Sequence, residues 1–290
     1  MAVFRTDLAL ERREGLGAGA LPGVKSRVWR REPVEITRID VLDERGQRAL
    51  GKPKGAYLTA ELLPRGEDNG EWLFSCAREL AALLRTLLPR EGTVLAAGLG
   101  NRSVTPDALG PETLRHLIVT RHLISAMPET FGGMRPVCAV AAGVLGDTGI
   151  ETVEILRGIV SRVRPAAVVA IDALCARSAG RLCRTFQLSD TGITPGSGAF
   201  NPRKALNAAT LGVPVIALGV PTVVEARTLA FDLLPEGADV SESALPDPGL
   251  LVTPKDIDRQ ITECGKILGY ALNLAMQRDL TPEEMEALLA

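Results

Sequence analysis

The stretch Thr93-Val94-Leu95-Ala96-Ala97-Gly98-Leu99-Gly100-Asn101 begins as a short apolar run and turns into a glycine-rich loop, which leads on to Asp107. A second apolar run, residues 166–171, leads directly into Asp172. In a parallel α/β sheet, ligands bind in the crevice beyond the carboxyl ends of the strands. Two aspartates that follow separate strands are therefore candidates for one carboxylate site, sharing a proton or holding a metal ion. The alternative is that each aspartate only caps the helix that follows it.

The apolar runs at residues 93–97, 137–142, 166–171 and 213–218 are short, do not alternate with polar residues and contain β-branched side chains. This pattern is typical of strands that are covered on both faces. Segments with helical spacing lie between these runs, near residues 111–126, 150–163 and 202–211. The alternation predicts an α/β fold with a mostly parallel sheet sandwiched between helices. Further helices are expected at residues 70–88, 255–276 and 279–290, and a further strand at 185–188.

The N-terminal part of the chain follows a different pattern. Residues 27–62 alternate apolar and polar side chains, with one break in register, and predict a small N-terminal antiparallel β element with a turn at residues 43–46. Residues 1–26 are expected to form a flexible arm, because the glycine-rich segment 15–23 cannot hold regular structure cheaply. The remainder, residues 27–290, is expected to be a single α/β domain.

The composition excludes several classes of protein. Of the 290 residues, 46% are hydrophobic and 23% charged, as in ordinary globular proteins, and the formal net charge is −2. A share of only 3% aromatic residues argues against base-stacking platforms, so no direct nucleic-acid partner is expected. The early charges at the N-terminus do not fit a secretory signal, and no apolar run approaches the ~20 residues that cross a bilayer. We therefore expect a cytoplasmic protein without a membrane partner.

Other catalytic constellations find little support. The two histidines, His116 and His122, are six residues apart and would lie on roughly opposite faces of one helix, so they do not form a zinc motif. No Gly-x-Ser-x-Gly elbow or phosphate-binding glycine pattern is present. The five cysteines are odd in number and lack Cys-x-x-Cys spacing, which indicates free thiols. The inventory is best suited to hydrolysis driven by carboxylates, and no cofactor or metal is expected.

Many blocks of the sequence, in order, resemble one family. The chain resembles the germination protease of spore-forming bacteria over nearly its whole length. The blocks are Arg5-Thr-Asp-Leu-Ala9, Gly98-Leu-Gly-Asn101, Val104-Thr-Pro-Asp-Ala-Leu-Gly-Pro111, Thr120-Arg-His-Leu123, Gly149-Ile-Glu-Thr152, Ala170-Ile-Asp-Ala-Leu174, Ala176-Arg-Ser178, Ser189-Asp190, Pro195-Gly-Ser-Gly198, Leu211-Gly-Val-Pro214, Gly219-Val-Pro-Thr-Val-Val224 and Val252-Thr-Pro-Lys-Asp256.

The resemblance implies an endopeptidase, made as a zymogen, that degrades small acid-soluble DNA-binding spore proteins during germination. It implies an atypical aspartic peptidase whose catalytic residues correspond to Asp107 and Asp172. It further implies a fold like that of hydrogenase maturation peptidases over residues 27–290, assembly as a homotetramer, and a location in the forespore or spore core.

The resemblance also suggests where peptides are bound and cut. The segment Arg5–Ala9 is similar to the family's self-cleavage site, so the bond between Asp7 and Leu8 is the expected cut, which would remove a pro-segment of residues 1–7. Candidate supports for the substrate backbone are Asn101, Ser189, Asp190, Gly196, Ser197 and Gly198. Plain tight turns remain the alternative for the two glycine loops, and an Asx-turn for Asp190.

Two departures from the family pattern stand out. Members usually carry a longer insertion before the segment at residues 252–256, and their pro-segments are longer than seven residues. Two other classes of function also remain open. One is a metal-dependent hydrolase with Asp107 and Asp172 as oxygen ligands. The other is an inactive scaffold that keeps the sheet but binds or assembles only.

Overall fold

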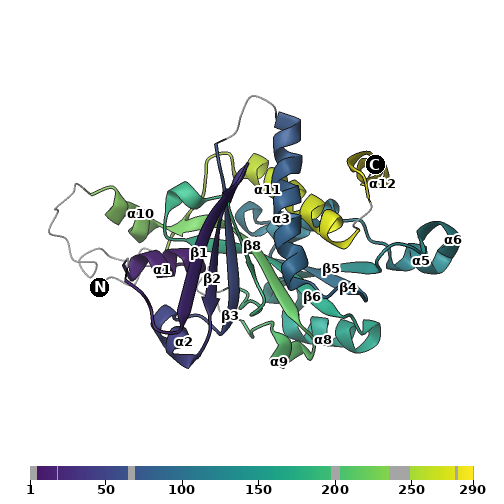
Figure 1. Ribbon diagram of the computed structural model, residues 1–290, viewed down its shortest axis with the longest axis horizontal. Helices are drawn as coiled ribbons and strands as arrows, with labels where there is room; N and C mark the ends of the chain where they lie inside the picture. The colour runs from purple at the N-terminus through teal and green to yellow at the C-terminus, as the bar shows by residue number, and fades with distance from the viewer. Residues whose placement is uncertain are drawn as a thin grey trace.

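The computed structural model describes residues 5–17, 19–64, 69–196, 203–234, 249–277 and 280–289. Within these ranges, nine strands form one mixed sheet with the order β1-β2-β3-β7-β8-β6-β4-β5, and β9 pairs with β8 (Figure 1). The strands are β1 (Val24–Arg31), β2 (Val34–Val41), β3 (Gly55–Leu62), β4 (Val94–Leu99), β5 (Val137–Gly143), β6 (Ala167–Ala176), β7 (Thr185–Ser189), β8 (Val215–Glu225) and β9 (Leu251–Val252).

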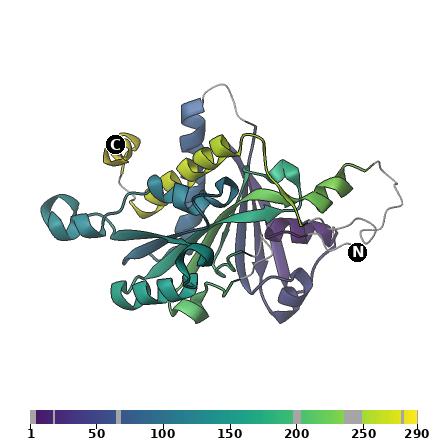
Figure 2. The same ribbon diagram turned by 180° about the vertical axis from the view of Figure 1, so that it is seen from behind.

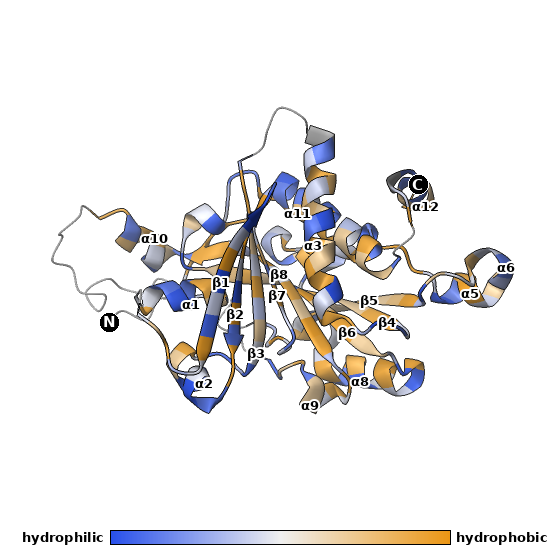
Figure 3. Cartoon of the chain, viewed as in Figure 1, coloured by the Kyte–Doolittle hydropathy of each residue, from blue (hydrophilic) through white to orange (hydrophobic). Residues whose placement is uncertain are grey.

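The strands β8, β6, β4 and β5 form the parallel half of this sheet. They lie where the four unalternating apolar runs predict strands, and β7 lies at the further strand predicted at residues 185–188. Every residue of β4 is buried, and Figure 3 shows β8 and β6 as mostly hydrophobic. An α/β fold with a sheet between helices is thereby confirmed, and its central strands are mostly parallel, because strands without a polar face need cover on both sides.

Helices supply that cover. On one face lie α3 (Asn69–Leu87), α4 (Leu109–Arg115) and α11 (Ile257–Met276), and on the other α8 (Thr152–Val163) and α9 (Ala208–Leu211) (Figures 1 and 2). The larger core cluster lies under α3, α4 and α11 and includes Phe186, Leu84 and Ile267, all fully buried. Each such side chain contributes about 1.5–3 kcal/mol relative to an exposed position.

The strands β1, β2, β3 and β7 form the antiparallel half. The predicted strands at residues 27–62 are present, but they do not form a separate small sheet, because β3 pairs with β7 and so joins the main sheet. The break in the alternation of β2 has a structural cause. Val34 and Ile36 pack into the core under α3, whereas Ile39 and Val41 face the opposite cluster, beside Tyr57.

Two expectations for the N-terminal region are wrong. Residues 9–15 of the expected arm form the helix α1 (Ala9–Gly15), which is ordered by packing, since Leu8 and Ala9 are completely buried. The turn expected at residues 43–46 begins the helix α2 (Glu44–Leu50), because the Asp43 side chain accepts a hydrogen bond from Gly46 N and caps it. The division into an arm and one domain stays a prediction.

The remaining short elements lie around the sheet. They are η1 (Thr105–Asp107), α5 (Arg121–Ala126), α6 (Pro128–Phe131), α7 (Leu145–Thr148), η2 (Ala179–Arg181), α10 (Ala226–Asp232) and α12 (Pro282–Leu289). The helix predicted at residues 255–276 from its apolar spacing is α11, and the tail helix predicted from the start signal Thr281-Pro282 is α12. Among the helices that the structure describes, none has the length and apolar character needed to cross a membrane.

Candidate active site

Asp107 is held at the end of the parallel half by the loop that follows β4. The loop passes so close that a Cβ on Gly100, which has φ +97°, would lie 2.0 Å from the Asp107 carbonyl oxygen. Asn101 N donates a hydrogen bond of 2.7 Å to Asp107 Oδ2, and Thr222 Oγ1 on β8 donates one of 2.7 Å to Pro106 O. These contacts fix the half-buried Asp107 carboxylate beside β6 and β8.

Asp172 lies inside β6 rather than at its end. The strand continues to Ala176, since its pairing with β8 extends past the apolar run, and Asp172 stands opposite Gly219 of β8. The side chain is only 5% exposed, and its Oδ1 accepts a hydrogen bond of 3.0 Å from Ala173 N. Asp172 therefore caps no helix, and its carboxyl group is buried among the strands at the active end of the sheet.

Asp107 lies close enough to Asp172 for its charge to affect the protonation of Asp172. Burial raises the pKa of Asp172 well above its usual range, and the charges of Asp107 and then Asp7 raise it further. Burial also raises the pKa of Asp107, against the effect of the Asn101 N–H. A buried carboxyl whose pKa is raised by a neighbouring carboxylate is a group suited to acid–base chemistry near neutral pH.

The N-terminal segment is docked against β6 beside this pair. Asp7 N donates a hydrogen bond of 2.9 Å to Cys175 O, and Cys175 N donates one of 2.9 Å to Asp7 Oδ2. Leu8 is fully buried and packs with Leu174 and Leu182. The Asp7–Leu8 peptide bond, the self-cleavage site suggested by the sequence, therefore lies next to the strand that carries Asp172.

Two residues that sequence reasoning missed contact the same segment. Lys52 Nζ donates a hydrogen bond of 2.8 Å to the carbonyl oxygen of Asp7, and Gln187 Nε2 donates one of 3.1 Å to the same oxygen. Gln187 Oε1 accepts a hydrogen bond of 2.7 Å from Ala9 N. Burial lowers the pKa of Lys52 to about 8, partly offset by the charge of Asp7. Gln187 adjoins the Ser189-Asp190 block, but no pattern in the sequence singles out Lys52.

The candidate substrate supports are spread over this end of the sheet. A cavity of about 280 Å³ is lined by Asp7, Lys52, Gln187 and Ser189, among others. The Ser189 side chain is buried and hydrogen-bonded to Thr191 Oγ1 at 2.8 Å.

The other candidate supports serve the backbone. Asp190 accepts a hydrogen bond of 2.8 Å from Ala56 N, and Asn101 Oδ1 accepts one of 2.8 Å from Ser103 N. Gly196 lies in a turn with φ +69°, whereas Ser197 and Gly198 lie outside the described residues. The placement of Asp190 and Asn101 favours a role in holding their loops, and their part in substrate binding stays a prediction.

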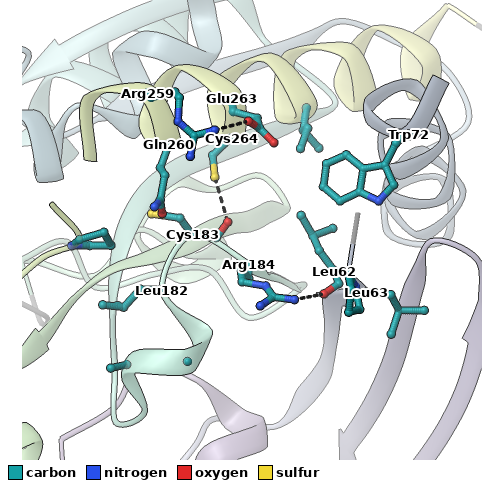
Figure 4. Close-up of a pocket in the computed structure, with 15 residues that line it drawn as sticks. Leu62, Leu63, Trp72, Leu182, Cys183, Arg184, Arg259, Gln260, Glu263 and Cys264 are labelled. Atoms are coloured by element: carbon teal, nitrogen blue, oxygen red, sulfur yellow. Dashed lines mark hydrogen bonds and ion pairs between the residues drawn. The ribbon is translucent and has the colours of Figure 1, made fainter. Parts of the chain in front are cut away.

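A second, larger cavity lies on the other face of the sheet, between α3, α11 and the segment before β7 (Figure 4). Its volume is about 670 Å³, and neither aspartate lines it. Figure 4 shows Cys264 on α11 above Cys183, whose carbonyl oxygen accepts a hydrogen bond of 3.4 Å from the Cys264 thiol. Trp72 on α3 lies at the opposite end. This cavity is separate from the site around Asp172.

The remaining candidate nucleophiles and ligands are the Cys175 thiol and the two histidines. Burial, followed by the charge of Asp7, raises the pKa of the Cys175 thiol to about 12, so this group stays protonated at neutral pH. His116 packs against Gly269 of α11, and His122 lies exposed on α5. Among the described residues, no three His, Cys, Asp or Glu side chains come together in a group that would hold a metal ion.

Comparison with known proteins places the chain in a family. A family model described as germination protease matches residues 5–235. A germination protease of Caldanaerobacter subterraneus subsp. tengcongensis is 44% identical, covering 99% of this chain and 98% of the relative. One from Clostridium perfringens is 40% identical over 98% of both chains, and one from Priestia megaterium is 35% identical over 99% of this chain and 95% of its own.

Among solved structures, a [NiFe] hydrogenase maturation protease, HycI from Thermococcus kodakarensis, is 14% identical, with a TM-score of 0.36 over 66% of this chain and 99% of that one. The sequence relatives, by contrast, match along nearly the whole length of the chain. The chain belongs to the germination protease family and is a peptidase.

Proposed function

We propose that this chain is an endopeptidase that initiates the degradation of small acid-soluble spore proteins during germination, and that it is made as a zymogen that cuts its own Asp7–Leu8 bond. Family membership supports the peptidase activity and the role in germination. The observation that carries the proposal is the docking of Asp7 on β6, where it forms two hydrogen bonds with Cys175 and its charge raises the pKa of Asp172. This docking puts the bond expected to be cut next to the strand that carries Asp172, which supports the proposal.

In the proposed reaction, Asp107 and Asp172 share one proton, which deeper burial keeps mainly on Asp172. The ionised Asp107 accepts a proton from water, whose oxygen bonds to the carbonyl carbon of Asp7. The protonated Asp172 gives its proton to the nitrogen of Leu8, and the C–N bond breaks. The products are a new carboxyl group on Asp7 and a free amine on Leu8.

The uncut segment accounts for latency, because it occupies the place that a substrate peptide would take. Its contacts include the two hydrogen bonds between Asp7 and Cys175 and an ion pair of 3.8 Å between Arg5 and Glu225. Cleavage releases residues 1–7 and these contacts with them. The helix α1 stays in place, since the Glu11 carboxylate accepts hydrogen bonds from the backbone N–H groups at the end of β6, at 2.7 and 2.9 Å.

Substrate proteins would bind in an extended conformation at the place that residues 5–8 occupy in the uncut chain. The expected cut follows an acidic residue and precedes an apolar and a small residue, as in Thr6-Asp7-Leu8-Ala9. Ser189, in the cavity beside Asp7, and the turn with Gly196 are the candidate supports for that backbone. We further propose that the enzyme acts as a homotetramer in the spore core. Light scattering of the purified protein tests the number of subunits.

Replacement of the carboxyl pair tests the proposal. We expect Asp107→Asn and Asp172→Asn to abolish self-cleavage and the degradation of small acid-soluble spore proteins, with the fold retained. The exposed Asp147→Asn is the matched control and should behave as wild type. The readouts are the N-terminal sequence of the chain and gel assays of substrate loss.

Three outcomes contradict the proposal. Normal turnover by either aspartate variant removes the carboxylate mechanism. Loss of activity on chelation, with stoichiometric bound metal, replaces it with a metal-dependent one. Intact wild-type protein with no peptidase activity makes the chain a scaffold.

A further inference from the structure

The carbonyl oxygen of Asp7 is held from two sides by side chains of the antiparallel half. Lys52 Nζ lies 2.8 Å from this oxygen and Gln187 Nε2 lies 3.1 Å from it. Both are donors, so the oxygen that belongs to the bond expected to be cut faces one ammonium and one amide N–H. Donors placed in this way are the arrangement that stabilises an oxyanion during attack on a carbonyl group.

We propose that Lys52 and Gln187 form the oxyanion site of this peptidase, binding the carbonyl oxygen of the scissile bond and stabilising the negative charge that develops there. This inference rests on the proposed self-cleavage between Asp7 and Leu8. Its new content is that catalysis needs a cation and an amide in addition to the carboxyl pair, and that each comes from a specific residue.

The end of α2 positions Lys52. Gly51 adopts φ +66° and its N–H donates to Gln47 O, so the helix ends and the chain reverses direction immediately before Lys52. On the other side of Lys52, Pro53 O accepts a hydrogen bond of 2.9 Å from Tyr57 Oη on β3. The lysine is thus held between two anchored points, with its ammonium directed to the docked segment. Burial lowers the pKa of Lys52, the charge of Asp7 raises it, and the nearby charge of Arg12 lowers it.

The middle of β7 positions Gln187, with β3 on one side and β8 on the other. Its neighbour across β8 is Gly219, which in turn stands opposite Asp172 on β6. Gly219 has no side chain, and the space above it is filled by Leu174 of β6, whose Cγ would lie 2.7 Å from a Cβ at that position. The amide orientation is fixed by chemistry: Ala9 N can only donate, so Oε1 faces Ala9 and Nε2 faces the Asp7 carbonyl.

The two donors act at one defined point of the reaction. As the water oxygen bonds to the carbonyl carbon of Asp7, the electron pair of the C=O double bond moves onto the carbonyl oxygen. A full positive charge on Lys52 attracts that oxyanion more strongly than it attracts the neutral carbonyl, so it lowers the barrier rather than merely binding the peptide. When the C–N bond to Leu8 breaks, the electron pair returns and the C=O bond re-forms.

The test uses full-length variants and the rate at which each loses residues 1–7, followed by mass spectrometry. We expect Lys52→Met and Gln187→Glu each to slow self-cleavage by roughly 10²–10³-fold, the usual effect of removing one oxyanion donor. Gln187→Glu keeps the acceptor for Ala9 N, removes the donor and adds a negative charge beside the Asp7 carbonyl oxygen, as Gln47→Glu adds one at an exposed position. Lys52→Arg keeps the charge and is expected to recover part of the rate.

Matched controls and the aspartate variants separate the possible failures. Lys54→Met and Gln47→Glu change exposed residues of the same types near α2 and should cleave at the wild-type rate. Thermal melting shows whether each variant is folded. If Lys52→Met does not fold, the rate of self-cleavage in Lys52→Arg tests the role of Lys52 instead. Wild-type rates in Lys52→Met and Gln187→Glu, with Asp107→Asn inactive, overturn this inference alone. Normal self-cleavage in Asp107→Asn and Asp172→Asn overturns the proposed function instead.

Discussion

In the parallel half of the sheet, the residues proposed for chemistry come from neighbouring segments: Asp107 from the loop after β4 and Asp172 from β6. In the antiparallel half, Lys52 comes from the turn after a short helix and Gln187 from the middle of a strand. The parallel half contributes carboxyl groups with raised pKa values, and the antiparallel half contributes hydrogen-bond donors, one of them charged.

The difference between the halves follows from their connections. Parallel strands all deliver their carboxyl ends to one edge, so residues that follow them are brought together by topology. Antiparallel strands alternate in direction and have no common active edge, so their residues reach a site only through particular contacts. The docked N-terminal segment lies between the halves, with Asp7 bound to Cys175 on one side and to Lys52 and Gln187 on the other.

The largest effect is expected from the parallel half. If carboxyl groups transfer the protons and the donors only stabilise charge, then Asp107→Asn should slow self-cleavage by about 10⁴-fold or more. Lys52→Met should slow it by roughly 10²–10³-fold. Time courses of N-terminal processing measure both. If the rate of self-cleavage falls equally in both variants, or more in Lys52→Met, then the roles assigned to the carboxyl groups and to Lys52 are wrong.

A second effect concerns the stability of the parallel half. The pKa of Asp172 is raised in the folded state, so the native protein holds a proton that the unfolded chain releases above its ordinary pKa. Stability is therefore lost as the pH rises from that ordinary pKa toward the folded one. We expect Asp172→Asn, which has no such group, to melt above wild type at pH 7, with a smaller difference near pH 4.

The control for this experiment is Asp147→Asn, since Asp147 is exposed. Its melting temperature relative to wild type should change little with pH. A gap between Asp172→Asn and wild type that is the same at pH 4 and pH 7 would contradict the assignment of a raised pKa to Asp172.

A third effect lies at the boundary of the two halves. A Cβ on Gly219 would lie 2.7 Å from Leu174 Cγ and 2.9 Å from Asp172 O, so Gly219→Ala forces β6 or its side chains to shift. We expect a loss of about 1–3 kcal/mol in the free energy of unfolding, with slower self-cleavage. Gly158→Ala in α8 meets nothing within 4 Å and should be neutral or slightly stabilising. Urea unfolding measures the free energy of unfolding of both variants. If Gly219→Ala is as stable as wild type, the two halves of the sheet tolerate rearrangement at this position.

The smallest effect is expected in the antiparallel half. Asp43→Ala removes the side chain that caps α2 and should cost about 1 kcal/mol of stability. Because α2 positions Lys52, a modest decrease in the rate of self-cleavage should accompany it. A variant that loses stability but cleaves at the wild-type rate would indicate that Lys52 is placed by the turn at Pro53 and Tyr57 alone.

Several features follow from the sequence because they depend on neighbouring residues. Short unalternating apolar runs predict strands buried on both faces, and β4, β5, β6 and β8 lie there. The alternation at residues 27–62 predicts antiparallel strands, and β1, β2 and β3 confirm them. The single break in this alternation does not by itself reveal that the two ends of β2 pack into two different core clusters.

Only the tertiary structure decides the rest, because the contacts join residues far apart in the chain. The Lys52–Asp7 contact spans 45 residues and the Gln187–Asp7 contact spans 180. Residues 1–26 are predicted to be a flexible arm because of the glycine-rich segment 15–23, whereas Leu8 is buried by Leu174, Leu182 and Val224, which lie far away in the sequence. Strand patterns and the acidic residues that follow apolar runs are local properties. The raised pKa of Asp172 and the donors on the Asp7 carbonyl exist only once the folded sheet brings its two halves against one peptide.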